Sequence, residues 1–178
     1  CALSELPVSI PQKKPKDLQR SLGLYMTAEG NTHGAEKQFA EINGTFGIQI
    51  LSSNLQPPEV KLAHRSVHIP CQSYKFYGSP FSEKFLTLQT HQMTTKLLPR
   101  LNFARNHPLA LRYAPKTRGG LGLSHFYVIQ GTLLIKQALK HIRLQSLLGE
   151  NLQIHLQWTQ LHSGLQIGIL TDTHTDLN

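Results

Sequence analysis

Acidic residues are the first group to weigh, because polymerases and nucleases of the two-metal kind hold their cations with clustered carboxylates. The chain of 178 residues has ten Asp and Glu residues and no Asp-Asp pair. Between Glu59 and Glu150 the sequence supplies a single acid, Glu83. A self-contained two-metal site is therefore not expected. We predict that this chain holds no cofactor and is catalytically inactive by itself.

The ten histidines suggest a second chemistry, metal binding. His64 and His68 stand four residues apart, so a helix would turn both to one side. The zinc-protease pattern requires a Glu directly after the first His, and Arg65 stands in that place. A cation beside the ligands also opposes a dication. Solvated histidines are therefore favoured over metal ligands.

Two further patterns carry little chemistry. The glycines at 119, 120 and 122 match neither the dinucleotide-binding pattern G-x-G-x-x-G nor the Walker A pattern of phosphate loops. A tight turn before Ser124, which can cap a following helix, is the favoured interpretation. The run DTHTD at 172–176 combines carboxylates with an imidazole, but it lies in a polar tail that supplies no fixed geometry.

Basic residues are the feature with the most functional weight. The chain has 18 Lys and Arg against ten acids, which gives a net charge of +8 and an isoelectric point near 9.7. From residue 61 to residue 143 there are thirteen basic residues and one acid, so this basic block carries +12. Its members are Lys61, Arg65, Lys75, Lys84, Lys96, Arg100, Arg105, Arg112, Lys116, Arg118, Lys136, Lys140 and Arg143. Such a one-signed stretch is the electrostatic footprint of a polyanionic partner.

Nucleic acid is the favoured partner of the basic block. An anionic membrane surface would need an amphipathic helix rich in Trp and Phe. No apolar run approaches the roughly 20 residues of a membrane-spanning helix, so no membrane partner is expected. A merely soluble basic surface is the plainest alternative.

Composition and the start of the chain narrow the class further. Apolar residues make up 39% and charged residues 16%, which suits one domain or two small ones and argues against a charged coiled coil. Cys1 and Cys71 are too few for a disulfide framework, and reduced thiols favour an intracellular location, cytoplasmic or nuclear. The chain begins without a Met or a signal pattern, so it is expected to be a fragment or a processed piece.

The elements that must position these residues can be predicted from apolar spacing, and they are mainly α-helical after a short β element. Residues 20–26 form an apolar run before the turn signal at 27–31, which predicts a strand. Residues 35–51 repeat apolar side chains at helical spacing, which predicts a helix. Gly44 and Gly47 weaken that helix by roughly 1 kcal/mol each relative to Ala.

The middle of the chain predicts two more helices. One begins at about Glu59, after a pair of prolines, and ends near Pro70. The other is capped by Ser82 and runs to about Leu98, where a proline stops it. Residues 109–113 are an apolar run that favours a short strand.

The last third of the chain predicts the longest helix, from His125 to about Leu147. Its core side shows Val128, Ile135, Leu139 and Ile142, and its basic side shows Lys136, Lys140 and Arg143. The following segment, 152–165, alternates like a strand and also fits a helix; its interleaved glutamines favour the helix.

Three stretches, taken in order, resemble the reverse transcriptases of non-LTR retrotransposon-like elements of eukaryotic microbes. Residues 20–31, RSLGLYMTAEGN, are similar to that family's strand and turn K-T-L-G-V-x-h-x-x-D-G-N, where h is apolar. Residues 97–106, LLPRLNFARN, are similar to its segment L-P-K-h-G-h-x-R. Residues 113–131, YAPKTRGGLGLSHFYVIQG, resemble its run G-P-x-x-x-G-G-L-G-h-P-x-h-Y-x-x-Q-G. The resemblance spans about residues 8 to 170.

The resemblance implies that the chain is the back end of a reverse transcriptase, an RNA-directed DNA polymerase. Residues 1–32 would end the polymerase palm with the strand called the primer grip, and residues 33–108 would form a helical thumb. Residues 109–170 would form a connection region with a long basic helix, followed by a flexible tail at 171–178. The Tyr/Phe-x-Asp-Asp hairpin would lie upstream of this chain, and the parent enzyme would need a divalent cation such as Mg²⁺.

The resemblance also implies which residues would touch nucleic acid. Leu22, Gly23 and Leu24 would lie beside the primer end, and the basic helices would follow the backbone of an RNA or DNA primer–template duplex. The expected contacts from the basic block are Arg100, Arg105, Arg112, Lys116, Arg118, Lys136, Lys140 and Arg143. About five phosphate contacts would give a slope of roughly −4 to −5 for log affinity against log salt. The rest of the polymerase polypeptide is the other implied partner.

Two other functions stay open from the sequence. A protein derived from a mobile element would keep the fold, and it would bind nucleic acid or serve a structural role without any polymerase core. A histidine-based metalloenzyme is the other, and a metal analysis without stoichiometric zinc would remove it. Flanking sequence, and not these residues, separates the polymerase from the non-enzymatic protein.

Overall fold

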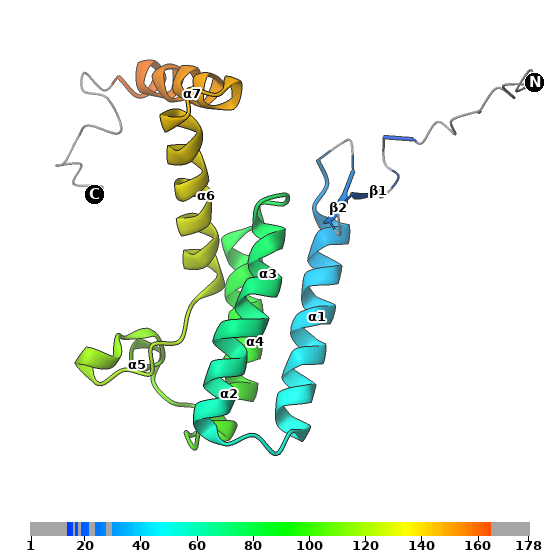
Figure 1. Cartoon of the computed structure of the whole chain (residues 1–178), viewed down its shortest axis with the longest axis vertical. Coiled ribbons are helices and arrows are strands. Elements are labelled where there is room, and N and C mark those ends of the chain that lie inside the picture. Colours follow the sequence, from blue (N-terminus) through cyan, green and yellow to red (C-terminus); the bar gives the residue numbers. More distant parts are fainter. Residues whose placement is uncertain (1–13, 16, 18, 22–23, 28–29, 165–178) are drawn as a thin grey trace, which may run out of the picture. The chain divides into compact units, whose positions relative to one another are not determined.

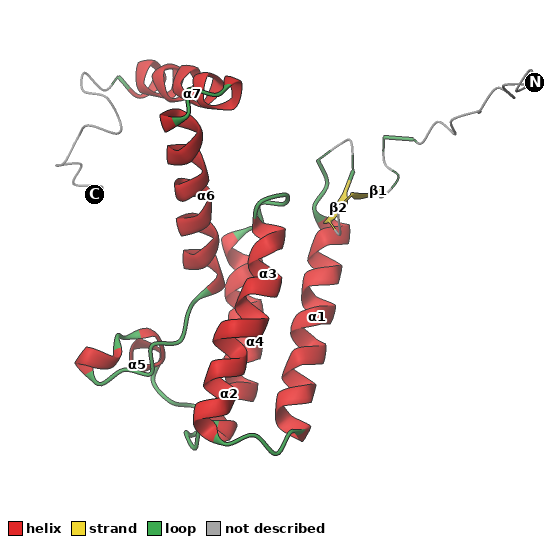
Figure 2. Cartoon of the chain, viewed as in Figure 1, coloured by secondary structure: helices red, strands yellow, loops and turns green. Residues whose placement is uncertain are grey.

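The computed structural model describes residues 14–15, 17, 19–21, 24–27 and 30–164 (Figure 1). Within these residues the chain is mainly α-helical with a short β element at its N-terminal side, which confirms the predicted fold class (Figure 2). Residues 1–127 and 128–178 form two compact units, called here unit 1 and unit 2. Unit 1 carries the β element and a packed group of helices, and unit 2 carries two consecutive helices.

The β element is an antiparallel pair of strands, β1 (Gln19–Ser21) and β2 (Leu24–Met26). Arg20 pairs with Tyr25 in this ladder. The sequence predicted one strand over 20–26, and the structure divides that run into two paired strands. Pairing within the run gives backbone N–H and C=O groups partners that an isolated strand would lack.

The first long helix of unit 1 is α1 (His33–Ser52), which confirms the first predicted helix. Phe39 is fully buried on its inner side. Gly47 is also buried, and a Cβ at this position would lie only 2.5 Å from the Lys96 side chain. The glycine that weakens the helix locally therefore leaves room for a lysine stem from another helix.

The next helical rod joins three segments: α2 (Pro57–Ala63), the π-helical segment η1 (His64–His68) and α3 (Ile69–Phe76). The sequence predicted an end near Pro70, and this prediction is wrong. Proline breaks an α-helix because it lacks the N–H that bonds to the carbonyl four residues earlier. Here the Ile69 N–H donates to the carbonyl of His64, five residues earlier, and Pro70 falls in the first turn of α3. The wider turn carries the rod past the proline.

The second long helix of unit 1 is α4 (Glu83–Arg100), which begins at the predicted cap. The Ser82 hydroxyl accepts a hydrogen bond from the Phe85 N–H at 3.3 Å. α4 packs against α1 and α2 around a core centred on Phe39. Four rings surround Phe39 at centroid separations of 5.3–5.8 Å: Phe76, Phe81, Phe85 and Phe126. Each such pair adds about 0.5–1.5 kcal/mol to the stability that area burial supplies.

After α4 comes an irregular region with one helical turn, α5 (Leu109–Tyr113), and a 3-10 turn, η2 (Lys116–Arg118). The strand predicted over 109–113 is therefore wrong. A five-residue apolar run is too short for its period to separate strand from helix. The Pro108 carbonyl accepts a bond from the Arg112 N–H at 3.1 Å, which closes a helical turn instead.

Unit 2 consists mainly of two consecutive helices joined by a short turn. They are α6 (Phe126–Arg143), whose first two residues belong to unit 1, and α7 (Leu147–Ser163), which runs across the end of α6 (Figure 1). α6 ends four residues before the predicted end because Gln145 adopts a φ of 48° and Ser146 caps α7. α7 confirms that the segment 152–165 is helical as far as the structure describes it.

The predicted core side of α6 is mostly exposed, which corrects the sequence prediction. Its exposed members are Val128, Ile135 and Leu139. The two helices meet near the turn that joins them, so most of the apolar stripe of α6 has no helix of unit 2 to cover it. An apolar cavity of about 430 Å³ remains between the two helices, lined by Leu134, Ile135, Gln137, Ala138, His141, Leu148 and Leu152.

Candidate functional site

The predicted contact residues differ in how free their charged groups are. Leu22 and Gly23 lie outside the described residues, and Leu24 belongs to β2. Among the eight predicted cations, Arg100 and Arg112 bond to backbone carbonyls of their own unit. The other six are exposed: Arg105, Lys116, Arg118, Lys136, Lys140 and Arg143.

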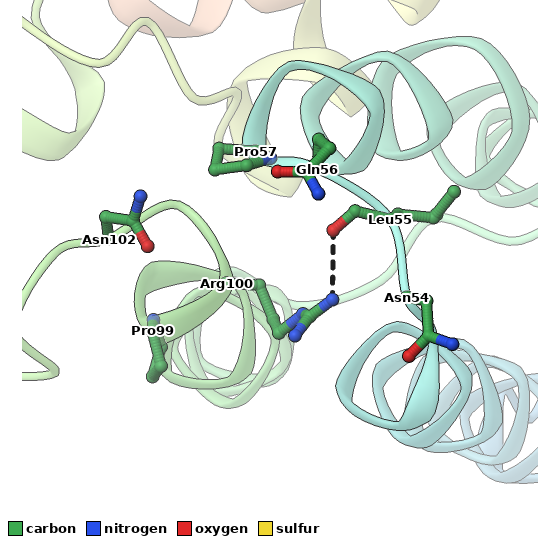
Figure 3. A pocket seen from close by; sticks show the side chains of 7 residues that line it. All are labelled: Asn54, Leu55, Gln56, Pro57, Pro99, Arg100 and Asn102. Atoms are coloured by element: carbon green, nitrogen blue, oxygen red, sulfur yellow. Dashed lines mark hydrogen bonds between the residues drawn. The ribbon is translucent and has the colours of Figure 1, made fainter.

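Arg100, at the end of α4, reaches the loop between α1 and α2 (Figure 3). Its guanidinium group donates to the backbone carbonyls of Ser53 and Leu55, the second at 2.9 Å. The same loop and the end of α4 line a cavity of about 410 Å³, with Asn54 and Asn102 on its border. Arg100 thus uses donors to order the loop, which leaves fewer of them for a bound ligand.

Arg112, on α5, is buried, with 4% of its surface exposed. Its Nε donates to the His107 carbonyl at 2.6 Å, and an Nη donates to the Arg105 carbonyl at 3.0 Å. These bonds give two nitrogens of a buried charged group backbone acceptors, while Nη1 is buried without a hydrogen-bond partner. Arg112 therefore fixes the backbone that carries the exposed Arg105 and presents little of its own charge to solvent.

Three cations from different segments line one cavity of about 260 Å³ in unit 1. Lys61 lies on α2 and Arg65 on η1, one turn further along the same rod. Lys116 comes from η2, much later in the chain. The other lining residues are His64, Ile69, Gly122, Leu123 and Ser124, so none of the described lining residues is an acid. We call this cavity the cationic pocket.

Backbone geometry holds the loop 114–123, which forms the wall opposite α2. The Gly122 N–H donates to the Ala114 carbonyl at 2.9 Å. Gly120 packs against the same carbonyl so closely that a Cβ would lie 2.1 Å from its oxygen. Gly122 has a φ of +60°, in the left-handed region that glycine enters without strain. The tight turn predicted here is confirmed, and its glycines fix the loop that carries Lys116.

The cationic pocket concentrates positive charge. The Lys61 ammonium group is half-buried and donates to the Leu121 backbone carbonyl. Burial is the main reason that the pKa of Lys61 is lowered, and the nearby Lys116 and Arg65 charges lower it further. The Lys116 and Lys61 side chains line the same cavity. Like charges in one cavity repel, so an anion between them would lower the electrostatic free energy.

His64, on the wall of the cationic pocket, pairs with His68 through Nδ1 atoms 3.1 Å apart. Both rings are buried, and His68 stacks on Phe46 with ring centroids 4.3 Å apart. The expectation of solvated histidines is therefore wrong, because the i, i+4 spacing turns both rings toward α1. Burial lowers the pKa of His64 to about 4; burial, together with the charges of His64 and Lys75, lowers the pKa of His68 to about 3. Both imidazoles are thus neutral at pH 7.

The histidine pair offers two ring nitrogens, fewer than the three or four protein ligands of a zinc site. In the part of the chain that the structure describes, no three His, Cys, Asp or Glu residues come together. The stacking on Phe46 and an edge contact between His68 and Phe126 instead join the pair to the aromatic core. The arrangement suits packing and a neutral hydrogen bond better than metal chemistry.

Unit 2 carries a second basic feature, which we call the α6 ridge: Lys136, Lys140 and Arg143. All three side chains are exposed. Their i, i+4, i+7 spacing places them on one side of the helix in successive turns, as the sequence predicted. Two of them stand in the last turn, where cations also stabilise the negative end of the helix dipole.

Sequence reasoning did not include Lys61 and Arg65 among the contact residues. Their i, i+4 spacing in a predicted helix was the available signal, since it places two cations on one face. That signal resembles the spacing of His64 and His68, which are offset by three residues along the same rod. Which of the two faces would meet Lys116 depends on the path of a distant loop.

Comparison of the chain with known protein families, with curated proteins and with solved structures finds no match. None of the described helices is both long enough and apolar enough to cross a membrane. The charges and the cavity of the described residues are thus the features from which a function can be inferred.

Proposed function

We propose that this chain binds the phosphate backbone of a nucleic-acid duplex without reading its sequence. The observation that carries the proposal is the basic block, thirteen cations against one acid between residues 61 and 143. Eight of the thirteen side chains are exposed: Arg65, Lys84, Arg105, Lys116, Arg118, Lys136, Lys140 and Arg143. Each exposed cation that neutralises a phosphate releases a condensed counterion, and this release drives binding.

The arrangement of the exposed cations favours backbone contacts over base readout. The α6 ridge spreads charge along one helix side, and Arg105 and Arg118 lie on exposed loop or turn segments of unit 1. Contacts of this kind position a protein on a duplex and supply affinity that is independent of sequence. Bidentate base contacts would instead need side chains projecting from an element that enters a groove.

The resemblance to reverse transcriptases supports a more specific role. In that role the chain would hold the primer–template duplex of an RNA-directed DNA polymerase, and Leu22, Gly23 and Leu24 would lie beside the primer end. The catalytic aspartates and their divalent cation would belong to the rest of the polymerase polypeptide. A non-enzymatic nucleic-acid-binding protein derived from a mobile element is the alternative. An in-frame Tyr/Phe-x-Asp-Asp upstream of Cys1 in the transcript would favour the polymerase, and a stop codon there would favour the alternative.

The duplex-binding proposal can be tested by fluorescence anisotropy with a labelled RNA–DNA hybrid. Between about 50 and 200 mM salt, about five phosphate contacts predict a slope of roughly −4 to −5 in log affinity against log salt. Two hybrids of unrelated sequence should bind alike. A flat salt dependence, or a strong preference for one sequence, would contradict the proposal.

A matched pair of variants assigns the binding to the basic block. Replacing Lys136 and Lys140 with Gln removes two charges of the α6 ridge and should reduce the magnitude of the salt slope by about 2. Replacing Lys14 and Lys37 with Gln removes two exposed charges outside the block. The control pair should leave the slope nearly unchanged. Equal losses in both pairs would mean that only the net charge matters.

A further inference from the structure

We propose that the cationic pocket binds a single phosphomonoester dianion, held by Lys61, Arg65 and Lys116. This site goes beyond backbone binding, because it would take a terminal phosphate group and not a stretch of duplex. The three cations line one cavity of about 260 Å³, and Ser124, which carries a hydroxyl group, is a further lining residue. Small anions with several oxygens suit such a set of converging donors.

The convergence of the three cations points to a ligand with more than one negative charge. A bridging phosphodiester carries a single charge, whereas a phosphomonoester carries about −1.5 to −2 at neutral pH. Arg65 supplies a planar fork, and the two lysines supply compact ammonium groups. His64, on the wall, is neutral at pH 7 because burial lowers its pKa. The charge available to the ligand therefore comes from the two lysines and Arg65.

The site is also built before any ligand binds. Lys61 is anchored by its bond to the Leu121 carbonyl, so it cannot swing away from Lys116 without losing that bond. The loop with Lys116 is fixed by the Gly122 bond to the Ala114 carbonyl and by the close packing of Gly120. A preformed site spends less free energy on ordering side chains when a ligand arrives. The like charges are therefore held together by the fold.

A titration of the full chain with two small probes tests the site. Methyl phosphate is a monoester and mainly a dianion at about pH 7.5, and dimethyl phosphate is a diester with one charge. Followed by amide chemical shifts in nuclear magnetic resonance, methyl phosphate should shift Gly122 and Leu123 and bind at least about tenfold more tightly than dimethyl phosphate. Equal affinities, or no methyl phosphate binding, would overturn the proposal.

Variants locate the binding within the fold. Arg65→Gln combined with Lys116→Gln changes two exposed residues and should weaken methyl phosphate binding by about tenfold or more. The control, Lys14→Gln with Lys37→Gln, removes the same charge elsewhere and should change the affinity less than about twofold. A thermal melt of each variant checks that it folds. Retained binding in a folded Arg65/Lys116 variant would overturn the proposal, and Lys116→Gln alone decides the case if the double variant does not fold.

The source of the phosphate is resolved by comparing the same hybrid duplex with a 5′-phosphate and with a 5′-hydroxyl. If nucleic-acid ends are the source, the phosphorylated duplex binds more tightly, and the Arg65/Lys116 variant loses that preference. If the two duplexes bind alike while methyl phosphate still binds, a small phosphomonoester such as a mononucleotide is the ligand and the pocket proposal stands. If no duplex binds and methyl phosphate does, duplex binding fails as a function and the pocket proposal stands.

Discussion

The cationic pocket of unit 1 and the α6 ridge of unit 2 use the same kind of residues with different results. Both contain two cations at i, i+4 on a helical segment: Lys61 with Arg65, and Lys136 with Lys140. On the ridge a third cation follows on the same helix, and all three are exposed. In the pocket the third cation, Lys116, comes from a distant loop and encloses a cavity with the first two.

The difference shows that spacing along a helix produces a row of charges and that a long-range contact is needed to make charges converge. A row in solvent is strongly screened by salt and suits a long polyanion. Cations that share a partly buried cavity act on one small anion in a lower dielectric. The unit that holds the pocket also buries its histidine pair, whereas the ridge lies on one of two helices with little buried core between them.

The largest expected effect is a loss of stability at acidic pH, which falls on unit 1 because it holds His64 and His68. An unperturbed histidine has a pKa of about 6.5. Above this pH, His64 and His68 are mainly neutral in both the folded and the unfolded chain. As the pH falls below 6.5, the unfolded chain takes up protons that folded His64 and His68 bind only near about 4 and about 3. Stability is thus complete above 6.5 and is lost on acidification, by about 2 kcal/mol for each histidine at pH 5.

Urea unfolding of the full chain at pH 7 and pH 5 measures this loss. His64→Leu combined with His68→Phe should remove most of the pH dependence, and His91→Gln, at an exposed position, should keep it. An equal loss of stability at pH 5 in the double variant would refute the role of the buried pair.

The second expected effect compares one glycine from each unit. A Cβ at Gly120 would lie 2.1 Å from the Ala114 oxygen, and a Cβ at Gly149 would lie 2.2 Å from the His141 oxygen. Both contacts are with backbone, which cannot move aside cheaply, so each alanine variant should lose about 3 kcal/mol of local stability. Hydrogen exchange should show Gly120→Ala opening the pocket loop and Gly149→Ala opening the turn between α6 and α7. Methyl phosphate binding should be lost only in Gly120→Ala. Loss of binding in both variants would contradict the expectation that the pocket depends on unit 1 alone.

The smallest expected effect has the opposite sign. Gly44 lies inside α1, and a Cβ there would meet no atom within 4 Å. Gly44→Ala should therefore stabilise unit 1 by about 0.5–1 kcal/mol, because alanine has the higher helix propensity. Gly47→Ala is the matched control, since its Cβ would collide with the Lys96 side chain. We expect a higher urea midpoint for Gly44→Ala and not for Gly47→Ala. An equal rise in both midpoints would show that the Lys96 side chain moves aside at little cost.

Much of the helical structure was predictable because its signals are local. The Ser82 hydroxyl accepts a hydrogen bond from an N–H only three residues later, and the apolar spacing of α1 repeats within a few turns. The errors at Pro70 and at 109–113 arose where a local sequence rule did not decide the structure. The π turn before Pro70 places His64 and His68 against Phe46, and the short apolar run could not reveal which turn Pro108 would close.

The net charge, the single acid of the basic block and the row of cations on α6 follow from the order of the residues alone. Charge is a sum over residues, and the row follows from the helical period. The burial of Arg112 and the meeting of Lys116 with Lys61 and Arg65 follow from the folded structure. Arg112 is placed by the carbonyls of His107 and Arg105 that its guanidinium group reaches. Lys116 is placed by the path of the loop 114–123, which no local period encodes.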